Sequence, residues 1–132
     1  MIVTKCPLRI SLAGGSTDLQ DFIDHYGIGS VISFPVSLYT YITVSSDVCG
    51  PNKVFGKYTI NYNKREEESK VENIKNDIAR EVLKYFECEQ VMCTFSSDIL
   101  SSGSGLASSS SYTLAFVKAI SRFKGVKLSN SE

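Results

Sequence analysis

The sequence predicts an α+β domain, on three observations. Segments rich in β-forming residues adjoin one another without intervening helices, unlike the strict alternation of a doubly wound parallel sheet. Two later segments place apolar residues at helical spacing. The 132 residues, 42% of them hydrophobic, suffice for one domain with its own core. The expected order is strand, short helix, three strands, long helix, strand and helix.

The first half of the chain supplies most of the expected strands. Residues Ile2–Ser11 alternate loosely and predict a strand, with Pro7 near an edge or a bulge. A turn over residues 13–18 then leads into a short helical stripe that ends at Gly27. Three more strands are expected over residues 30–34, 38–46 and 54–62.

The second half is predicted to supply the two longer helices. The charged run 64–70, which includes Glu66–Glu68, is interpreted as a solvated surface segment. From Val71 onward the apolar residues take up a helical period, with the inward face Val71, Ile74, Ile78, Val82, Tyr85 and Phe86. A strand is expected over residues 90–96. The final helix has the apolar face Tyr112, Phe116, Ala119, Ile120 and Phe123.

Charge and composition argue against several classes of protein. Lys plus Arg equals Asp plus Glu at 14 each, and a nucleic-acid binder that relies on counterion release is normally basic. No apolar run approaches the ~20 residues that span a bilayer. The N-terminal residues lack the features of a secretory signal, so a cytoplasmic protein without a membrane partner is expected. The four cysteines are expected to be reduced and mostly buried, because none has metal-ligand spacing.

A Ser/Gly run passes directly into the final helix, and this join predicts an anion site. The run reads LSSGSGLASSSS from Leu100 onward. A helix N-terminus carries about four unpaired N–H donors and roughly half a positive charge, which suits phosphate. The alternatives are a flexible linker and the tight packing of small residues, but a linker seldom joins an apolar helix without a break.

Phosphoryl transfer gives the Ser/Gly run a specific chemistry. Residues 104–108 can present backbone N–H groups to phosphate oxygens, and Ser109 or Ser110 can place a hydroxyl on Mg²⁺. The run matches neither a Walker-type phosphate loop nor a dinucleotide-binding fingerprint.

A second segment, RISLAGGSTD from Arg9 to Asp18, is suited to polyol recognition. Asp18 can accept hydrogen bonds from two vicinal hydroxyls, and Arg9 can bind a phosphate. Gly14 and Gly15 let the backbone approach a ligand without a Cβ clash. The structural alternative makes Asp18 or Thr17 a helix N-cap, the glycines a tight turn and Arg9 a surface cation.

Three other polar or aromatic residues carry weaker signals. His25, the single histidine, follows the short helix and is interpreted as surface chemistry at a helix end. Tyr39 and Tyr41 share one face of a predicted strand, where ordinary sheet packing is favoured over contact with adenine or sugar.

Together, the two segments resemble motifs of the galactokinase, homoserine kinase, mevalonate kinase and phosphomevalonate kinase (GHMP) superfamily. The Arg9–Asp18 segment is most similar to the start of the bacterial heptose-phosphate kinases, with Ser16 where a third glycine is usual. The run 102–110 is similar to the superfamily's phosphate motif, with Ala107 where glycine is common.

The resemblance implies the fold and the ligands. It implies a two-layer sandwich like domain 2 of a ribosomal protein, with a left-handed β-α-β unit. It implies ATP and Mg²⁺, with Ser109 as the metal ligand, Asp18 at a sugar hydroxyl and Arg9 near the transferred phosphate. The implied nucleotide-binding residues are Ser102, Gly103, Ser104, Gly105, Leu106, Ala107, Ser108, Ser109 and Ser110. The implied substrate-binding residues are Arg9, Gly14, Gly15, Ser16, Thr17 and Asp18.

The resemblance also implies catalytic parts that this sequence does not contain. The catalytic aspartate and a second glycine-rich motif are expected after Glu132, and Ser129 and Glu132 have the spacing of a capping box that begins a helix. Residues 1–132 are therefore expected to form the ATP-binding N-terminal domain of a longer sugar kinase, without its C-terminal domain and inactive alone. The alternatives are a non-catalytic sugar- or nucleotide-binding module on the same fold and, less favoured by the neutral charge, a structural or RNA-binding domain.

Overall fold

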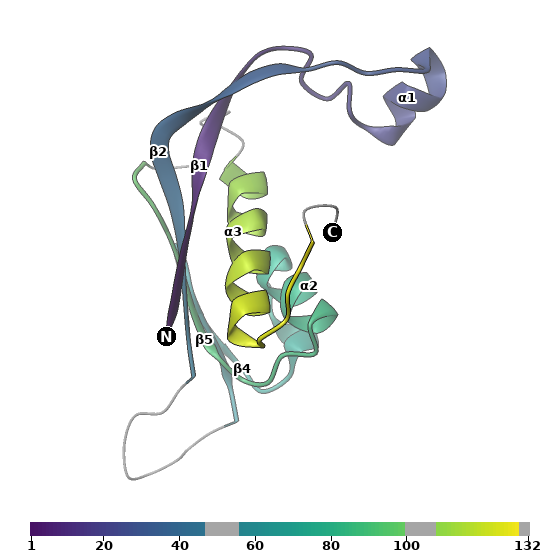
Figure 1. The fold of residues 1–132 in the computed structure, drawn as a ribbon. Coiled ribbons are helices and arrows are strands. Elements are labelled where there is room, and N and C mark those ends of the chain that lie inside the picture. Colours follow the sequence, from purple (N-terminus) through teal and green to yellow (C-terminus); the bar gives the residue numbers. More distant parts are fainter. Residues whose placement is uncertain (47–55, 100–107, 130–132) are drawn as a thin grey trace.

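A single β-sheet organises the chain, and two helices cover one of its faces (Figure 1). The computed structural model describes residues 1–46, 56–99 and 108–129. The described strands are β1 (Ile2–Ala13), β2 (Ile32–Ser45), β3 (Tyr58–Asn61), β4 (Arg65–Glu68) and β5 (Met92–Ser97). The described helices are α1 (Gln20–Tyr26), a 3-10 turn (Val71–Asn73), α2 (Asp77–Tyr85) and α3 (Ser108–Phe123).

The sheet mixes antiparallel and parallel pairs. Its strand order is β1-β2-β5-β3-β4, and only the pair β3–β5 is parallel among the described strands. The chain passes from β3 to β5 through β4 and α2. This arrangement, with helices on one face, confirms the predicted α+β class.

Alternate strand residues face the helices and form the core. Ile42 and Val44 of β2 lie beside Phe95 and Cys93 of β5 in the antiparallel register, and all four are buried. Phe116 of α3 packs its ring against Phe95, with the ring centroids 5.1 Å apart. The predicted face of α3 is confirmed: Phe116, Ala119 and Ile120 are buried, and Tyr112 and Phe123 pack against the same core.

The predicted inward face of α2 is partly wrong. Tyr85, expected inside, is 79% exposed, whereas Ala79 and Leu83 are fully buried. The reason is that residues 71–73 form a separate 3-10 turn and the α-helix begins only at Asp77, so the phase of the helix differs from that of one continuous helix.

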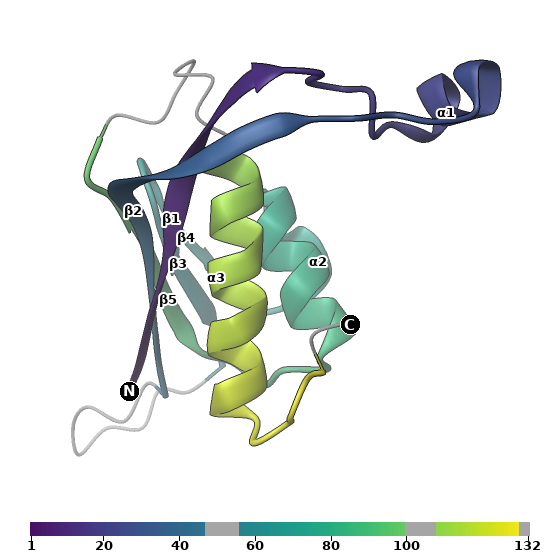
Figure 2. The same ribbon diagram turned by 45° about the horizontal axis from the view of Figure 1, so that its top comes forward.

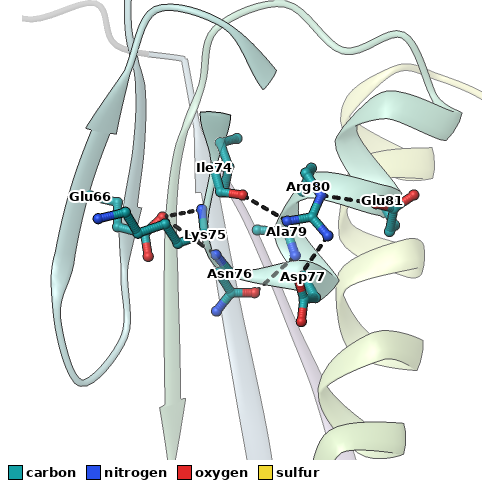
Figure 3. Close-up of polar contacts among 8 residues, drawn as sticks. All are labelled: Glu66, Ile74, Lys75, Asn76, Asp77, Ala79, Arg80 and Glu81. Atoms are coloured by element: carbon teal, nitrogen blue, oxygen red, sulfur yellow. Dashed lines mark hydrogen bonds and ion pairs between the residues drawn. The ribbon is translucent and has the colours of Figure 1, made fainter. Parts of the chain in front are cut away.

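The charged run 64–70 is mostly exposed, as predicted, but it contains the edge strand β4, which was not predicted. Glu66 lies opposite Ile60 in the β3–β4 pair and faces the helices. Its carboxylate accepts hydrogen bonds from the backbone N–H groups of Lys75 (2.8 Å) and Asn76 (3.4 Å) (Figure 3). It also accepts a hydrogen bond from the Tyr62 hydroxyl. Glu66 therefore ties the β3–β4 hairpin to the start of α2.

The start of α2 is also capped by its own residues. The Asn76 side chain accepts a hydrogen bond from the Ala79 N–H at 2.9 Å, as an N-cap does. Arg80 donates to the Ile74 carbonyl at 3.0 Å and pairs with Asp77 at 2.7 Å (Figure 3).

The far ends of β1 and β2 form an arm that carries α1 away from the helical layer (Figure 2). The two strands predicted over residues 30–46 are one continuous strand, β2. No residue of α1 is buried, and Gly27 ends that helix with a φ of 80°, as predicted. Pro7 lies on the edge strand β1 beside a register shift, which confirms both parts of its prediction.

The predictions for the cysteines and for the capping box can be compared with the structure only where their residues are described. Cys88 and Cys93 are buried and Cys6 is half-buried, whereas Cys49 lies outside the described residues. Residues 126–129 form no helix, and the rest of the predicted capping box lies outside the described residues. Among the described helices, none has the length and apolarity needed to cross a bilayer.

Candidate functional site

Arg9 lies on β1 just after the bulge, with its side chain exposed. The register shifts between Pro7 and Arg9, so that Arg9 pairs with Pro35 of β2. Within the described parts of the chain, the guanidinium makes no hydrogen bond or ion pair. An unpaired guanidinium has its five N–H donors available for an anionic ligand.

The glycine turn after β1 packs closely against the segment that leads into β2. A Cβ on Gly14 would lie 1.9 Å from the Ser30 carbonyl oxygen, and one on Gly29 would lie 1.8 Å from the Thr17 carbonyl oxygen. The Thr17 hydroxyl also lies within hydrogen-bond distance of the carbonyls of Gly14 (2.8 Å) and Ser30 (3.0 Å). Gly14 therefore permits two chain segments to approach each other, which sequence reasoning had interpreted as approach to a ligand.

The remaining residues of the turn stay open to solvent. A Cβ on Gly15 would meet nothing within 4 Å, and Ser16 has a φ of 67°, the region that favours the glycine usual there. Leu19 is the N-cap of α1, without a side-chain hydrogen bond, so the N-cap interpretation of Asp18 or Thr17 is wrong. The exposed Asp18 carboxylate has no partner in the described ranges 1–46, 56–99 and 108–129.

The Ser/Gly run is described only where it enters α3. Ser102, Gly103, Ser104, Gly105, Leu106 and Ala107 lie outside the described residues. Ser108, Ser109 and Ser110 form the first turn of α3, as the predicted join of loop and helix requires. Ser109 and Ser110 are exposed, and neither hydroxyl bonds to another described residue. The first turn therefore presents two hydroxyls at the positive end of a 16-residue helix.

Two hydrogen bonds fix α3 against β1. Ser111, a residue that is only 4% exposed, donates a hydrogen bond from its hydroxyl to the Pro7 carbonyl at 3.1 Å. The Thr4 hydroxyl donates to the Ala115 carbonyl at 2.7 Å, one turn further along α3. The N-terminus of α3 is thus held beside the bulge that precedes Arg9.

A cavity of about 260 Å³ lies at this junction and joins the two predicted segments. It is lined by Cys6, Pro7 and Arg9 of β1, by Ser33, Phe34 and Pro35 of β2, and by Ser110, Ser111 and Leu114 of α3. The structure therefore brings Arg9 and Ser110 together from positions about one hundred residues apart in the sequence. Gly14, Gly15, Ser16, Thr17 and Asp18 are not among the lining residues and belong to the arm.

Sequence reasoning missed the β2 wall of this cavity. Phe34 and Pro35 lie opposite Ile10 and Arg9 in the β1–β2 pairing. Neither residue type signals ligand chemistry by itself, and only the register of a long hairpin places them beside Arg9. No cluster of three or more His, Cys, Asp or Glu side chains suited to a metal ion occurs among the described residues.

The family comparison identifies the class to which this fold corresponds. The description "GHMP kinases N terminal domain" belongs to a family model that matches residues 72–132, from the 3-10 turn through α3. This match confirms the resemblance for the second half of the chain, and the α+β sheet with its helical layer matches the GHMP kinase N-terminal fold.

Among individual proteins, the chain is similar to heptose-phosphate kinases and to a sugar kinase. The chain is 30% identical to D-glycero-alpha-D-manno-heptose 7-phosphate kinase of Campylobacter jejuni, across 99% of this chain and 40% of that protein. It matches a crystal structure of a D-glycero-D-manno-heptose 1-phosphate kinase from Bacteriodes thetaiotaomicron with a TM-score of 0.77, over 100% of this chain and 45% of the other, at 21% identity. It also matches a candidate sugar kinase from Campylobacter jejuni with a TM-score of 0.70, at 29% identity over 98% of this chain and 41% of the other. The chain thus spans less than half the length of each of these relatives.

Proposed function

We propose that this chain is the nucleotide-binding part of an ATP-dependent kinase that phosphorylates a hydroxyl of a sugar or sugar phosphate. The observation that carries the proposal is the shared cavity, where the unpaired Arg9 faces the same space as Ser110 in the first turn of α3. The likeness to a heptose 7-phosphate kinase over nearly the whole chain supports the substrate class.

Arg9, Asp18 and Ser109 have surroundings that permit the roles proposed for them. The helix end and the Ser/Gly run bind the phosphates of ATP, and Arg9 stabilises charge on the phosphoryl group during in-line transfer. The unpaired Asp18 accepts hydrogen bonds from sugar hydroxyls and orients the substrate. If Mg²⁺ binds with the nucleotide, the exposed Ser109 hydroxyl would be one of its ligands, and the ion would neutralise phosphate charge. We further propose that residues 1–132 form one domain of a cytoplasmic enzyme.

Titration calorimetry with ATP·Mg²⁺ tests the nucleotide-binding half of the proposal. The folded chain, and the complete protein that its gene encodes, should both bind ATP·Mg²⁺ at millimolar concentrations or below. Undetectable binding by a folded sample of the complete protein would overturn the proposal. Binding of ATP and sugar without turnover would favour a non-catalytic module instead.

The role of Arg9 is tested by substitution in the complete protein. We expect Arg9→Ala to lower kcat for sugar phosphorylation by roughly a hundredfold, because a cation at a developing phosphoryl charge acts mainly in the transition state. Arg122→Ala is the matched control, since Arg122 is exposed in the last turn of α3, outside the cavity. Equal kcat values for the two variants would contradict the role of Arg9.

A further inference from the structure

Phe34 is an aromatic residue of β2 that lies on the core-facing side of the sheet and is nevertheless exposed. It is paired with Ile10 in the β1–β2 register, and directly opposed residues share a face of a sheet. Leu8, two residues before Ile10 on the same face, is fully buried, whereas Phe34 is 43% exposed. The β1–β2 hairpin continues past the start of α3 into the arm (Figure 2), so Phe34 lies just beyond the covered core.

The exposed side of Phe34 belongs to the cavity of the candidate site. Phe34 lines this cavity with the apolar residues Pro35 and Leu114 and with the polar residues Arg9 and Ser110. Within the described ranges, the Arg9 guanidinium and the Ser110 hydroxyl have no bonding partner, and Phe34 makes no contact with another aromatic ring. The cavity therefore combines an apolar wall with a few available polar groups, which is the usual composition of a small-molecule site.

The size of the cavity and its position beside Arg9 indicate which ligand it takes. Its volume is about 260 Å³. Pockets for drug-sized ligands measure about 300–1,000 Å³, so this cavity suits a single ring better than a whole nucleotide. If Arg9 stabilises the transferred phosphoryl group, the acceptor hydroxyl must lie in line with that group, with the reacting atoms about 3–3.5 Å apart. The space beside Arg9 is then that of the acceptor sugar, since adenine is separated from the γ-phosphate by ribose and two further phosphates.

We propose that Phe34 is a substrate-binding residue whose ring packs against the C–H face of the acceptor sugar. The inference rests on the proposed function, because it names a contact to the acceptor of that reaction. Sugar rings carry hydroxyls around their edge and C–H bonds on their faces, so a flat apolar surface beside polar groups matches both. In this arrangement Asp18 on the arm binds hydroxyls, and Phe34 selects for the shape of the ring.

Steady-state kinetics of the complete protein test the inference. The assay uses ATP·Mg²⁺ and a panel of acceptors: a heptose 7-phosphate, mannose 6-phosphate and free mannose. We expect Phe34→Ala to raise KM for the phosphorylated acceptor about tenfold, because the sugar loses its apolar contact. KM for ATP should stay within about twofold of the wild type. A merely structural role of Phe34 would not separate the two KM values.

Two further variants of Phe34 separate the ring from its bulk. Phe34→Tyr keeps the aromatic face, and its KM for the acceptor should stay within about twofold of the wild type. Phe34→Leu keeps an apolar side chain without a flat face and should raise that KM about threefold. Phe34→Leu also provides the milder test if Phe34→Ala fails to fold.

Tyr85→Ala is the matched control. Tyr85 is an aromatic residue of α2 that is 79% exposed and does not line this cavity, so both KM values should remain those of the wild type. Urea denaturation of every variant shows whether it is folded under the conditions of the assay.

The outcomes separate this inference from the proposed function. An unchanged KM for the acceptor in folded Phe34→Ala would overturn the inference and leave the proposed function intact. Equal rises of KM for ATP and for the acceptor would also overturn it. A lower urea midpoint with unchanged KM values would overturn it as well, because Phe34 would then pack against another part of the complete protein. Phosphorylation of no acceptor in the panel by the wild type would overturn both.

Discussion

Gly29 shows how a single residue can determine the conformation of the arm that carries α1. Its neighbour across the turn is the backbone of Thr17, which a methyl group at Gly29 would overlap. Sequence reasoning assigned the turn from the motif AGGST but gave Gly29 no role, because the contact joins segments twelve residues apart. The identity of the turn was predictable from residue types, and the partner that locks it was not.

Substitution of Gly29 should open the turn. We expect Gly29→Ala to accelerate amide exchange of the Thr17 N–H by tenfold or more, since overpacking typically costs ~1–3 kcal/mol. That N–H donates to the Gly14 carbonyl at 3.2 Å in the intact turn. Gly15→Ala is the control because its Cβ would meet nothing within 4 Å, so exchange should change by less than about twofold. Equal exchange in both variants would refute the locking contact.

At the scale of helices and strands, the spacing of apolar residues predicts the buried face of α3 correctly and that of α2 only in part. The stripe Phe116, Ala119 and Ile120 predicted the buried face of α3 because one uninterrupted helix packs on one sheet face. The same reasoning misplaced Tyr85, since the break between the 3-10 turn and Asp77 resets the helical phase. Strand β4 was missed because its sequence, REEE, is composed of residues that strands usually avoid, and pairing with β3 overrides that preference.

The carboxylate of Glu66 should make the joint between β4 and α2 sensitive to acid. Burial acts to raise the pKa of Glu66, but hydrogen bonds from Tyr62, Lys75 and Asn76 outweigh it and hold the pKa below its usual value. A carboxyl whose pKa is lowered by folding stabilises the protein above its unfolded pKa of about 4.3 and loses that contribution as pH falls through the folded value.

We therefore expect Glu66→Gln to lower the free energy of unfolding by about 1–2 kcal/mol at pH 7, and by less as the pH falls below about 4. Urea denaturation at a series of pH values measures this difference. Glu67→Gln is the matched control, because Glu67 is exposed and pairs with Arg65 at 2.7 Å, and its urea midpoint should stay that of the wild type. A pH-independent loss in Glu66→Gln would contradict the assignment.

At the scale of the whole molecule, the first strand, β1, is held against the last described helix, α3. β1 and α3 meet through the Thr4–Ala115 and Ser111–Pro7 hydrogen bonds, and the cavity of the candidate site lies at that meeting point. Residue types and spacing predicted that the two motifs act together. Only the tertiary fold could show that Arg9 joins Ser110 in the cavity while Asp18 remains on the arm.

Loss of a hydrogen bond between β1 and α3 should lower the stability of the fold. We expect Thr4→Val to lower the free energy of unfolding by about 1 kcal/mol, as measured by the urea midpoint, because it removes the hydroxyl that bonds to Ala115. Thr43→Val is the control: Thr43 is also half-buried but makes no hydrogen bond through its side chain to another described residue. A larger loss in Thr43→Val would contradict the importance of the β1–α3 contact.

The contact between β1 and α3 also determines how late in synthesis this part of the chain can finish folding. Ala115 follows Thr4 by 111 residues, and ribosomes add about 5–20 residues per second, so β1 is made on the order of ten seconds before its partner helix exists. During that interval β1 and β2 can pair as a hairpin, but Ile42 and Val44 lack the α3 residues with which they form the core. The cavity of the candidate site is therefore among the last parts of the described structure to form on the ribosome.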